Sequence, residues 1–343
     1  MTSDTTHMRL EIEEIPDATR RLLAESAAQM VAAGAALRDR QPAMVATIAR
    51  GSSDHATAFL KYAIELTAGV PVASIGPSIV SIYGRELKLA GCAAIAVSQS
   101  GKSPDIVAME ESARRNGALC IALTNTAGSP LALAADLTVD LRAGVETSVA
   151  ATKSFVSSVV AGLGILAHWT GDEGLLAALQ ALPDAFGRAV VADWTPLLAA
   201  LKGRDSLYVL GRGPALAIAQ EAALKFKETC GIHAEAYSAA EVLHGPARIV
   251  EGGFPVLALA ARDAGEAGVA EIADRLAGQG ATAFATTDRV KAAHTLPHVA
   301  TGHPVTDALT LIVSFYGFVE MLSRQRGFNP DKPPHLRKVT ETL

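Results

Sequence analysis

Val45-Ala-Thr-Ile-Ala-Arg-Gly51 is an apolar run that ends in Arg-Gly, and it returns later in the chain as Leu207-Tyr-Val-Leu-Gly-Arg-Gly213. The two Arg-Gly pairs are 162 residues apart. The same offset relates two further pairs of apolar runs: Ile95-Ala-Val97 with Leu257-Ala-Leu259, and Ile121-Ala-Leu-Thr124 with Ala283-Phe-Ala-Thr286. Several matches in one register indicate a duplicated domain.

Each copy alternates short apolar runs with helical stretches. In the first copy, Ala93–Val97 precedes the helical stretch Pro104–Arg115, and the apolar run Ala118–Leu123 follows. This alternation is typical of a parallel sheet covered by helices on both faces. The sequence therefore predicts two tandem doubly wound α/β domains.

The repeat also predicts where the domains begin and end. Helical periodicity runs from Ile12 to Arg38, with Pro16 near its start, and the segment from Gly187 to Pro196 is the expected linker. Prolines indicate that the tail is extended rather than helical. The predicted parts are a helical extension (1–40), a first domain (41–186), a second domain (197–325) and a C-terminal tail (326–343).

Composition narrows the class of protein. The 343 residues are 50% hydrophobic with a net charge of -5, and no run of Lys and Arg suggests nucleic-acid binding. The three cysteines have no pairing or metal-ligand spacing, which favours a reducing compartment. The longest apolar stretch, Phe155–Trp169, is too short for a membrane span and is predicted to be a buried helix. With no secretory signal at its start, we expect a cytoplasmic protein.

A serine-rich turn, Ser98-Gln-Ser-Gly-Lys-Ser103, follows the apolar run that ends at Val97. Ligands of open α/β sheets lie beyond the carboxyl ends of strands, where a helix N-terminus can hold a phosphate group. Ser52 and Ser53 occupy a second strand-end turn, whereas the second copy has Ala260-Ala-Arg-Asp-Ala-Gly265 instead. The alternative is ordinary turn chemistry with a helix cap.

Charged residues gather in the second copy. Glu221, Lys225 and Glu228 are spaced i, i+4 and i+7, which places them on one helical face. They are either a solvated Glu–Lys stripe or a set that includes an acid/base carboxylate, because an aldose–ketose shift needs one group to carry a proton between adjacent carbons.

Ser238-Ala-Ala-Glu241 has the pattern of a capping box, and Gly245-Pro246 is expected to end the short helix that it opens. His244 then lies in the last turn. It is either a favourable C-terminal cation or a group that moves protons near neutral pH. Lys338 stands in the tail, and the residues alone do not select it.

These motifs together resemble the isomerase half of glucosamine-6-phosphate synthase, a pair of sugar-isomerase (SIS) domains. They resemble the stand-alone SIS-type glucosamine-6-phosphate deaminases more closely. The resemblance covers nearly the whole chain and rests on six ordered motifs: Met8–Pro16, Arg50-Gly-Ser-Ser-Asp-His-Ala56, Ser98–Ser103, Gly144-Val-Glu-Thr-Ser-Val-Ala-Ala-Thr-Lys153, Leu210-Gly-Arg-Gly213 with Glu221–His244, and the Lys338 tail.

The resemblance implies a role for each matched residue. Glu228 would move the proton between C1 and C2, His244 would assist ring opening from the partner subunit of a homodimer, and Lys338 would contact the open-chain sugar or form an imine with it. Glu221 and Lys225 match supporting positions. The residues that would hold the sugar phosphate are Ser52, Ser53, Ser98, Gln99, Ser100 and Ser103.

The chain departs from the synthase in two ways. It shows no glutaminase domain with an N-terminal nucleophilic cysteine, and Lys102 stands where the synthase turn usually has glutamate. We therefore expect isomerising deamination of glucosamine 6-phosphate to fructose 6-phosphate and ammonia, with no cofactor and no metal.

Other activities share the same chemistry or the same fold. They are deamination of galactosamine 6-phosphate, deglycation of fructosamine phosphates and ammonia-dependent synthesis. A non-catalytic sugar-phosphate sensor is the alternative from another class, because a sensor needs the phosphate turn without an acid/base pair.

Overall fold

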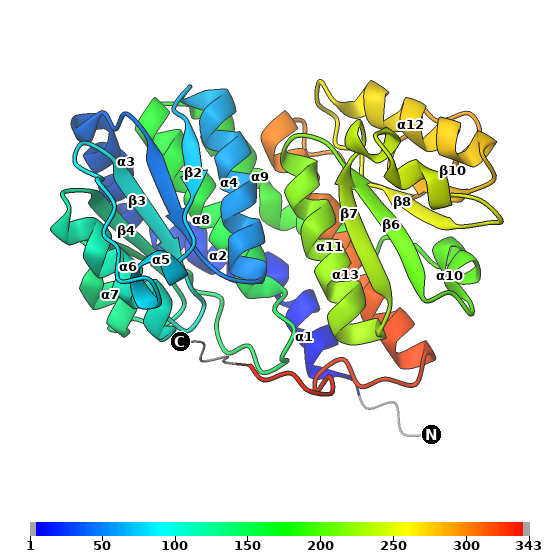
Figure 1. Cartoon of the computed structure of the whole chain (residues 1–343), viewed down its shortest axis with the longest axis horizontal. Coiled ribbons are helices and arrows are strands. Elements are labelled where there is room, and N and C mark those ends of the chain that lie inside the picture. The colour runs from blue at the N-terminus through cyan, green and yellow to red at the C-terminus, as the bar shows by residue number, and fades with distance from the viewer. Residues whose placement is uncertain (1–4, 339–343) are drawn as a thin grey trace. The chain divides into compact units, whose positions relative to one another are not determined.

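The structure is a computed structural model that describes residues 5–338. Two five-stranded parallel sheets organise the chain (Figure 1). The strands of the first sheet are β1 (Val45–Ile48), β2 (Val72–Ser74), β3 (Ala93–Val97), β4 (Leu119–Thr124) and β5 (Leu137–Asp140). The strands of the second are β6 (Ser206–Gly211), β7 (His233–Ser238), β8 (Pro255–Ala258), β9 (Thr282–Ala285) and β10 (His294–Thr295).

Helices surround both sheets and begin before the first strand. Up to residue 201 they are α1 (His7–Glu13), α2 (Ile15–Glu25), α3 (Ala27–Arg40), α4 (Ser52–Thr67), α5 (Ser78–Ser81), α6 (Pro104–Arg115), α7 (Pro130–Ala134), α8 (Lys153–Thr170), α9 (Glu173–Val190) and α10 (Pro196–Leu201). They continue with α11 (Pro214–Cys230), the 3₁₀ helices η1 (Glu241–Leu243) and η2 (Pro246–Ile249), α12 (Glu266–Gly278) and α13 (Pro304–Gln325).

The duplication predicted from the sequence is confirmed by the strand order. The first sheet runs β2-β1-β3-β4-β5, and the second has the matching order β7-β6-β8-β9-β10. Gly51 and Gly213, which occupy the same place in the two copies, adopt nearly the same backbone conformation (φ 56°, ψ -132° and φ 56°, ψ -135°) before their helices. Because this conformation strains residues that carry a Cβ, both copies keep glycine there.

Both faces of the inner strands β1, β3, β6 and β8 are buried, which explains why these strands are nearly continuous apolar runs. On one face of the first sheet, Ile48 and Ala96 pack with Ile106 and Met109 of α6. Residues that alternate with them, such as Val45, are also fully buried. The prediction of doubly wound α/β copies is confirmed.

Two compact units each contain one sheet, and the chain passes between them several times. The first unit comprises residues 17–146, 153–180 and 337–338, and the second comprises 5–16, 147–152 and 181–336. The short segments 5–16 and 147–152 thus belong with the second sheet, although they precede it in the sequence.

The predicted helical extension is divided into three helices, α1, α2 and α3, because the backbone departs from a continuous helix at Glu14 and at Ser26. The predicted linker 187–196 includes the last turn of α9. Within the described part of the tail, residues 326–338 form turns and irregular chain, as the prolines indicate.

Two helices have apolar character. The stretch Phe155–Trp169 lies in α8, whose residues from Lys153 to Ala167 are buried, so the prediction of a buried helix is confirmed. Among the described residues, α13 is the one helix long and apolar enough to cross a membrane, but 94% of its apolar window is buried within the protein. The cysteines are buried and form no disulfide in the described range.

One carboxyl group in the first unit is buried without a donor. The side chain of Glu110 in α6 is fully buried, and no described residue donates a hydrogen bond to either of its oxygens. Burial raises the pKa of Glu110 well above its ordinary value, and the Asp136 carboxylate raises it further. The carboxyl group is therefore neutral where a surface glutamate is charged.

We predict that Glu110→Gln stabilises the protein at neutral pH. The contribution of protonated Glu110 is complete below the unfolded pKa of about 4.3 and is lost as pH rises toward the higher folded pKa. The stability advantage of the Glu110→Gln variant over the parent protein should therefore grow from about pH 5 to about pH 8. Denaturant unfolding of both proteins across this range measures it, and a constant difference would contradict the buried-acid assignment.

Candidate active site

Two strand-end turns of the first sheet lie next to each other. Strands β1 and β3 are parallel neighbours, paired from Val45↔Ala93 to Ile48↔Ala96. Their carboxyl ends therefore meet at one edge, where β1 leads into α4 and β3 leads into α6. The residues that this edge collects are the six predicted phosphate-binding residues: Ser52, Ser53, Ser98, Gln99, Ser100 and Ser103.

The turn after β3 has a specific conformation. Gly101 has φ 62°, and a Cβ on it would lie 2.1 Å from Oγ of Ser129, so the position requires glycine. Gly101 donates its backbone N–H to Oγ of Ser98 (3.2 Å), and Lys102 donates to Oγ of Ser100 (3.3 Å). Ser103 is the N-cap of α6, but its side chain makes no capping bond with the described residues. The alternative of ordinary helix capping therefore does not account for Ser103.

An ion pair connects the two turns. Arg50, directly before Gly51, donates from Nε (2.9 Å) and Nη2 (2.7 Å) to Oδ2 of Asp105 in the first turn of α6. The Asp105 side chain is 1% exposed and that of Arg50 is 50% exposed. Sequence reasoning used Arg50 to align the repeat and within the family motif Arg50–Ala56, but it missed Asp105, since nothing in the sequence indicates that the two residues meet.

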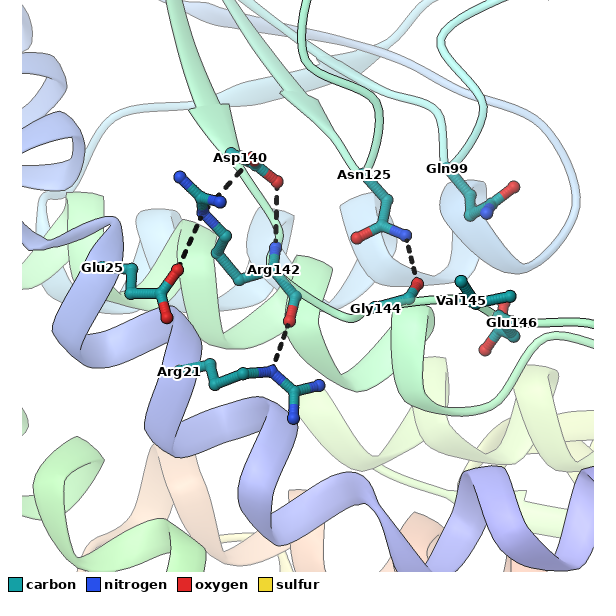
Figure 2. Close-up of a pocket in the computed structure, with 9 residues that line it drawn as sticks. All are labelled: Arg21, Glu25, Gln99, Asn125, Asp140, Arg142, Gly144, Val145 and Glu146. Carbon is teal, nitrogen blue, oxygen red and sulfur yellow. Dashed lines mark hydrogen bonds and ion pairs between the residues drawn. The ribbon is translucent and has the colours of Figure 1, made fainter.

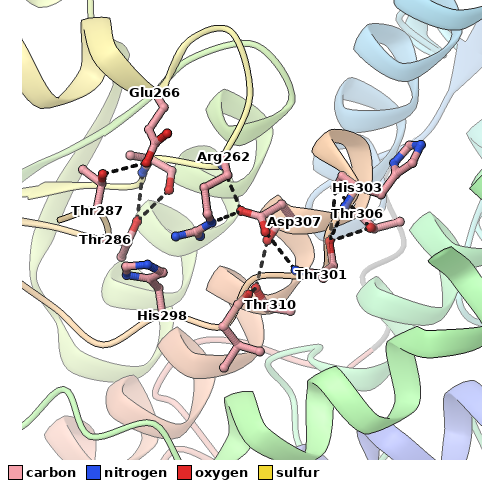
Figure 3. Close-up of polar contacts among 12 residues, drawn as sticks. Arg262, Glu266, Thr286, Thr287, His298, Thr301, His303, Thr306, Asp307 and Thr310 are labelled. Atoms are coloured by element: carbon pink, nitrogen blue, oxygen red, sulfur yellow. Dashed lines mark hydrogen bonds and ion pairs between the residues drawn. The ribbon is translucent and has the colours of Figure 1, made fainter. Parts of the chain in front are cut away.

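The second copy provides an internal comparison. By the 162-residue offset, the positions aligned with the six predicted phosphate ligands hold Pro214, Ala215, Ala260, Ala261, Arg262 and Gly265, and Ala267 aligns with Asp105. Here the backbone N–H (2.9 Å) and Nε (2.8 Å) of Arg262 donate to Oδ2 of Asp307, and Thr301 donates to its other oxygen (Figure 3). The turn of the second copy is thus held by the protein's own charged side chains.

We predict that Arg50→Met weakens binding of a sugar phosphate about tenfold, or about 1.4 kcal/mol. The change releases the link between the turns and leaves the buried Asp105 carboxylate uncompensated beside them. Titration calorimetry with fructose 6-phosphate measures the effect. Arg212→Met is the matched control, because Arg212 precedes the turn of the copy without serines. If both variants lose affinity for fructose 6-phosphate equally, Arg50 has no specific role in phosphate binding.

The three charged residues predicted on one helical face lie together on α11. Lys225 Nζ contacts Oε1 of Glu221 at 3.1 Å and donates to Oε2 of Glu228 at 2.6 Å. Tyr316 of α13 donates its hydroxyl to Glu221 at 3.1 Å. The side chains of Glu221 and Lys225 are 0% exposed and that of Glu228 is 21% exposed, so the alternative of a solvated stripe is wrong.

Lys225 is a cation despite its burial. Burial alone would lower the pKa of its amine, but the carboxylates of Glu221 and Glu228 raise it well above its ordinary value. The ammonium therefore holds the Glu228 carboxylate in place, while the exposed part of Glu228 can meet a ligand. A carboxylate fixed in this way can accept a proton from carbon and return it to a neighbouring atom.

His244 lies outside regular helix. The predicted capping box does not form, because Ser238 is the last residue of β7 and the N-cap of η1 is Ala240, which has no side-chain oxygen. His244 is the exposed C-cap of η1, followed by Gly245 with φ 134°. An exposed imidazole beside a sharp turn is accessible to a ligand or to another protein chain.

Lys338 belongs to the first unit and contacts a buried carboxylate. Its Nζ lies 2.8 Å from Oε2 of Glu146, whose side chain is 0% exposed. Ser154 donates to both oxygens of this carboxylate, from its backbone N–H to Oε1 (3.1 Å) and from Oγ to Oε2 (2.6 Å). Sequence reasoning quoted Glu146 only within the motif Gly144–Lys153 and gave it no role.

Glu146 also lines a cavity of about 510 Å³ at the carboxyl edge of the first sheet. Figure 2 shows Gln99, Asn125 and Glu146 along it, with Arg21, Glu25 and Arg142 at its other side. Asn125 shapes the wall by donating to the carbonyl of Gly144 (2.8 Å) and accepting from Ala143 (2.9 Å). The cavity connects the predicted phosphate turn with the carboxylate that holds Lys338.

The predicted site residues thus form two groups within the units. The six turn residues and Lys338 belong to the first unit, and Glu221, Lys225, Glu228 and His244 belong to the second. Within residues 5–338, no group of three or more His, Cys, Asp or Glu side chains is placed to hold a metal ion.

The strand orders and the repeated strand-end glycines define the class first: a tandem doubly wound α/β protein with flavodoxin-like sheet order. The family follows from comparison with known proteins. Residues 40–166 and 200–314 match the model of the SIS domain. The chain belongs to the SIS-domain family, and the resemblance noted in the sequence is confirmed.

Curated relatives have the same domain pair within longer chains. The chain is 37% identical over 262 residues to the glutamine–fructose-6-phosphate aminotransferase (isomerizing) of Aeropyrum pernix, covering 71% of this chain and 42% of that protein. It is 34% identical over 307 residues to the Pyrobaculum aerophilum protein of the same name, covering 85% and 50%. The chain thus spans half or less of the length of these relatives.

Solved structures include a chain of higher identity and others that share the fold at lower identity. A proposed phosphosugar isomerase of Silicibacter pomeroyi DSS-3 is 57% identical, with a TM-score of 0.93 over 95% of this chain and 100% of that one. The glucosamine-6-phosphate deaminase of Thermotoga maritima has a TM-score of 0.77 at 19% identity, over 98% and 100% of the two chains, and shares the fold.

Proposed function

We propose that this protein is a phosphosugar isomerase that acts on amino-sugar phosphates. The observation that carries the proposal is the largely buried cluster of three charged side chains on α11, in which Lys225 pairs with both Glu221 and Glu228. Burying charged groups costs several kcal/mol of desolvation and adds little net stability, so such a cluster favours a functional role. Names of the relatives support the substrate class, since they include fructose-6-phosphate aminotransferases and phosphosugar isomerases.

The finer proposal is isomerising deamination of glucosamine 6-phosphate. The serine turns would hold the phosphate, and His244 would assist opening of the sugar ring. Glu228 would take the proton from C2 and deliver it to C1, which converts the amine-bearing carbon into an imine through an enolamine. Hydrolysis of this imine releases ammonia and leaves fructose 6-phosphate. The resemblance to stand-alone deaminases supports deamination as the direction of the reaction.

Direct product analysis tests the proposal. Incubation with glucosamine 6-phosphate should give ammonia and fructose 6-phosphate in equal amounts. If ammonia is released from galactosamine 6-phosphate but not from glucosamine 6-phosphate, the substrate is the galactosamine epimer. Release of an amine from a fructosamine phosphate would indicate a deglycase. Unchanged sugar with measurable binding to each compound would indicate a sensor and reject the catalytic proposal.

Glu228→Gln tests the proposed proton carrier. The amide keeps the shape and can still accept a hydrogen bond from Lys225, but it does not act as a base at neutral pH. We expect sugar-phosphate affinity within about threefold of the parent protein and a loss of at least about 10²-fold in exchange of the C2 hydrogen with solvent. Deuterium incorporation followed by NMR measures it. Exchange at the parent rate would assign the proton transfer to another group.

We also propose a homodimer in which His244 acts in the partner's site. Its exposure at the end of η1 supports this arrangement. If the site is shared, mixing inactive Glu228→Gln with inactive His244→Ala subunits should restore up to about a quarter of the parent activity, because some mixed dimers contain one intact site. Activity after mixing that stays at the level of the separate variants would contradict a shared site.

A further inference from the structure

The ion pair between Lys338 and Glu146 has a feature that a structural salt bridge does not need. The Glu146 side chain is fully buried, the Lys338 side chain is 24% exposed, and Glu146 lines the cavity that Gln99 also lines. A partly exposed lysine held in this way has a proton acceptor next to its amine. The arrangement suits an amine that must lose and regain a proton at a site.

We propose that Glu146 is the proton acceptor that converts Lys338 from ammonium to amine, so that Lys338 can attack the carbonyl carbon of an open-chain phosphosugar. The inference rests on the proposed function, since it deepens the role of the tail lysine. It assigns to Glu146 a role in positioning and proton transfer that acts through Lys338.

The steps balance in atoms and charge. A proton moves from Nζ of Lys338 to Oε2 of Glu146 along the 2.8 Å contact. The amine lone pair then forms a C–N bond while the C=O π electrons move to oxygen, and a proton passes from nitrogen to that oxygen. Protonated Glu146 returns its proton to the new hydroxyl group, which leaves as water. The product is an iminium on Lys338, which acidifies the adjacent C–H bond.

Ser154 fixes the carboxylate for this exchange. Its two donors hold both oxygens of Glu146. Burial alone would raise the pKa of Glu146, but the Lys338 ammonium and the Ser154 donors lower it, so the resting pair is ionic. Approach of a carbonyl group that displaces water from the cavity would weaken the solvation of the ions and favour transfer of the proton within the pair.

Other charged groups lie around the same cavity. Arg142 contacts Glu25 at 3.5 Å and Asp140 at 3.3 Å, and the backbone carbonyl of Arg142 accepts from Arg21 at 3.4 Å. These residues pair with one another, whereas Glu146 pairs with Lys338. Glu25 is therefore a matched control: a carboxylate that lines the same cavity but contacts a different cation.

Reductive trapping tests the proposal without relying on turnover. The protein is incubated with fructose 6-phosphate and sodium cyanoborohydride, which reduces the iminium to a stable secondary amine. The peptide that carries Lys338 is then followed by mass spectrometry. We expect an adduct on the parent protein, a rate at least about tenfold lower in Glu146→Gln, and a parent-like rate in Glu25→Gln. Lys338→Met should give no adduct at this position.

Chemical rescue separates proton transfer from a structural effect. Glu146→Ala opens space in a cavity that small solutes can enter, and added formate should restore the trapping rate at least severalfold if the carboxylate acts as a base. Chloride at the same ionic strength should not restore it. Thermal unfolding of the variants establishes that they are folded.

The outcomes distinguish this inference from the proposed function. Trapping of Glu146→Gln at the parent rate, or a Glu146→Ala protein that formate does not rescue, overturns the role of Glu146 even if the enzyme releases ammonia. An adduct that depends on Glu146 supports it even if glucosamine 6-phosphate is not deaminated. A parent protein that turns over but forms no adduct excludes attack by Lys338 and overturns the inference.

Discussion

Parallel pairing of β1 with β3 is the constraint on which the predicted phosphate site depends. Parallel neighbours end at the same edge of a sheet, and therefore the turns after Ile48 and Val97 meet although they lie about 50 residues apart in the chain. Gly51 and Gly101 permit the sharp turns, and the Arg50–Asp105 ion pair joins them. The serine hydroxyls of two separate segments are thereby collected at one place.

Duplication supplies the same scaffold twice, but the copies use it differently. The first copy has small hydroxyl side chains at its strand-end turns, two of which accept hydrogen bonds from the turn's own backbone. In the second copy, Asp307 accepts hydrogen bonds from the backbone N–H and Nε of Arg262 at the corresponding turn. The second copy instead carries its functional candidates on α11, the helix that follows the turn after β6. One fold therefore provides a predicted binding turn in one copy and a largely buried cluster of charged side chains in the other.

Several charged side chains of this protein are buried, which is energetically unusual. Glu221, Lys225 and Glu146 are removed from solvent, and each has a partner of opposite charge at hydrogen-bonding distance. Such pairs contribute little to stability, because desolvation offsets most of the Coulomb attraction. Their value lies in fixing protonation and orientation, which a site for proton transfer needs. Glu110 is a contrasting case, since no described residue donates a hydrogen bond to its buried carboxyl group, and burial raises its pKa so that it is held neutral.

The duplication and the fold class can be predicted from the amino-acid sequence alone, because apolar runs, strand-end glycines and a constant offset are visible along the chain. The sequence also placed the serine turns and the Glu–Lys–Glu spacing of α11, since a turn after a strand and an i, i+4, i+7 stripe follow from local geometry. Three features are visible only in the folded protein: the burial of this stripe, the contact of Arg50 with Asp105 and the contact of Lys338 with Glu146. These contacts join residues 55 and 192 positions apart. Burial and long-range pairing depend on how distant segments pack, and no local pattern encodes them.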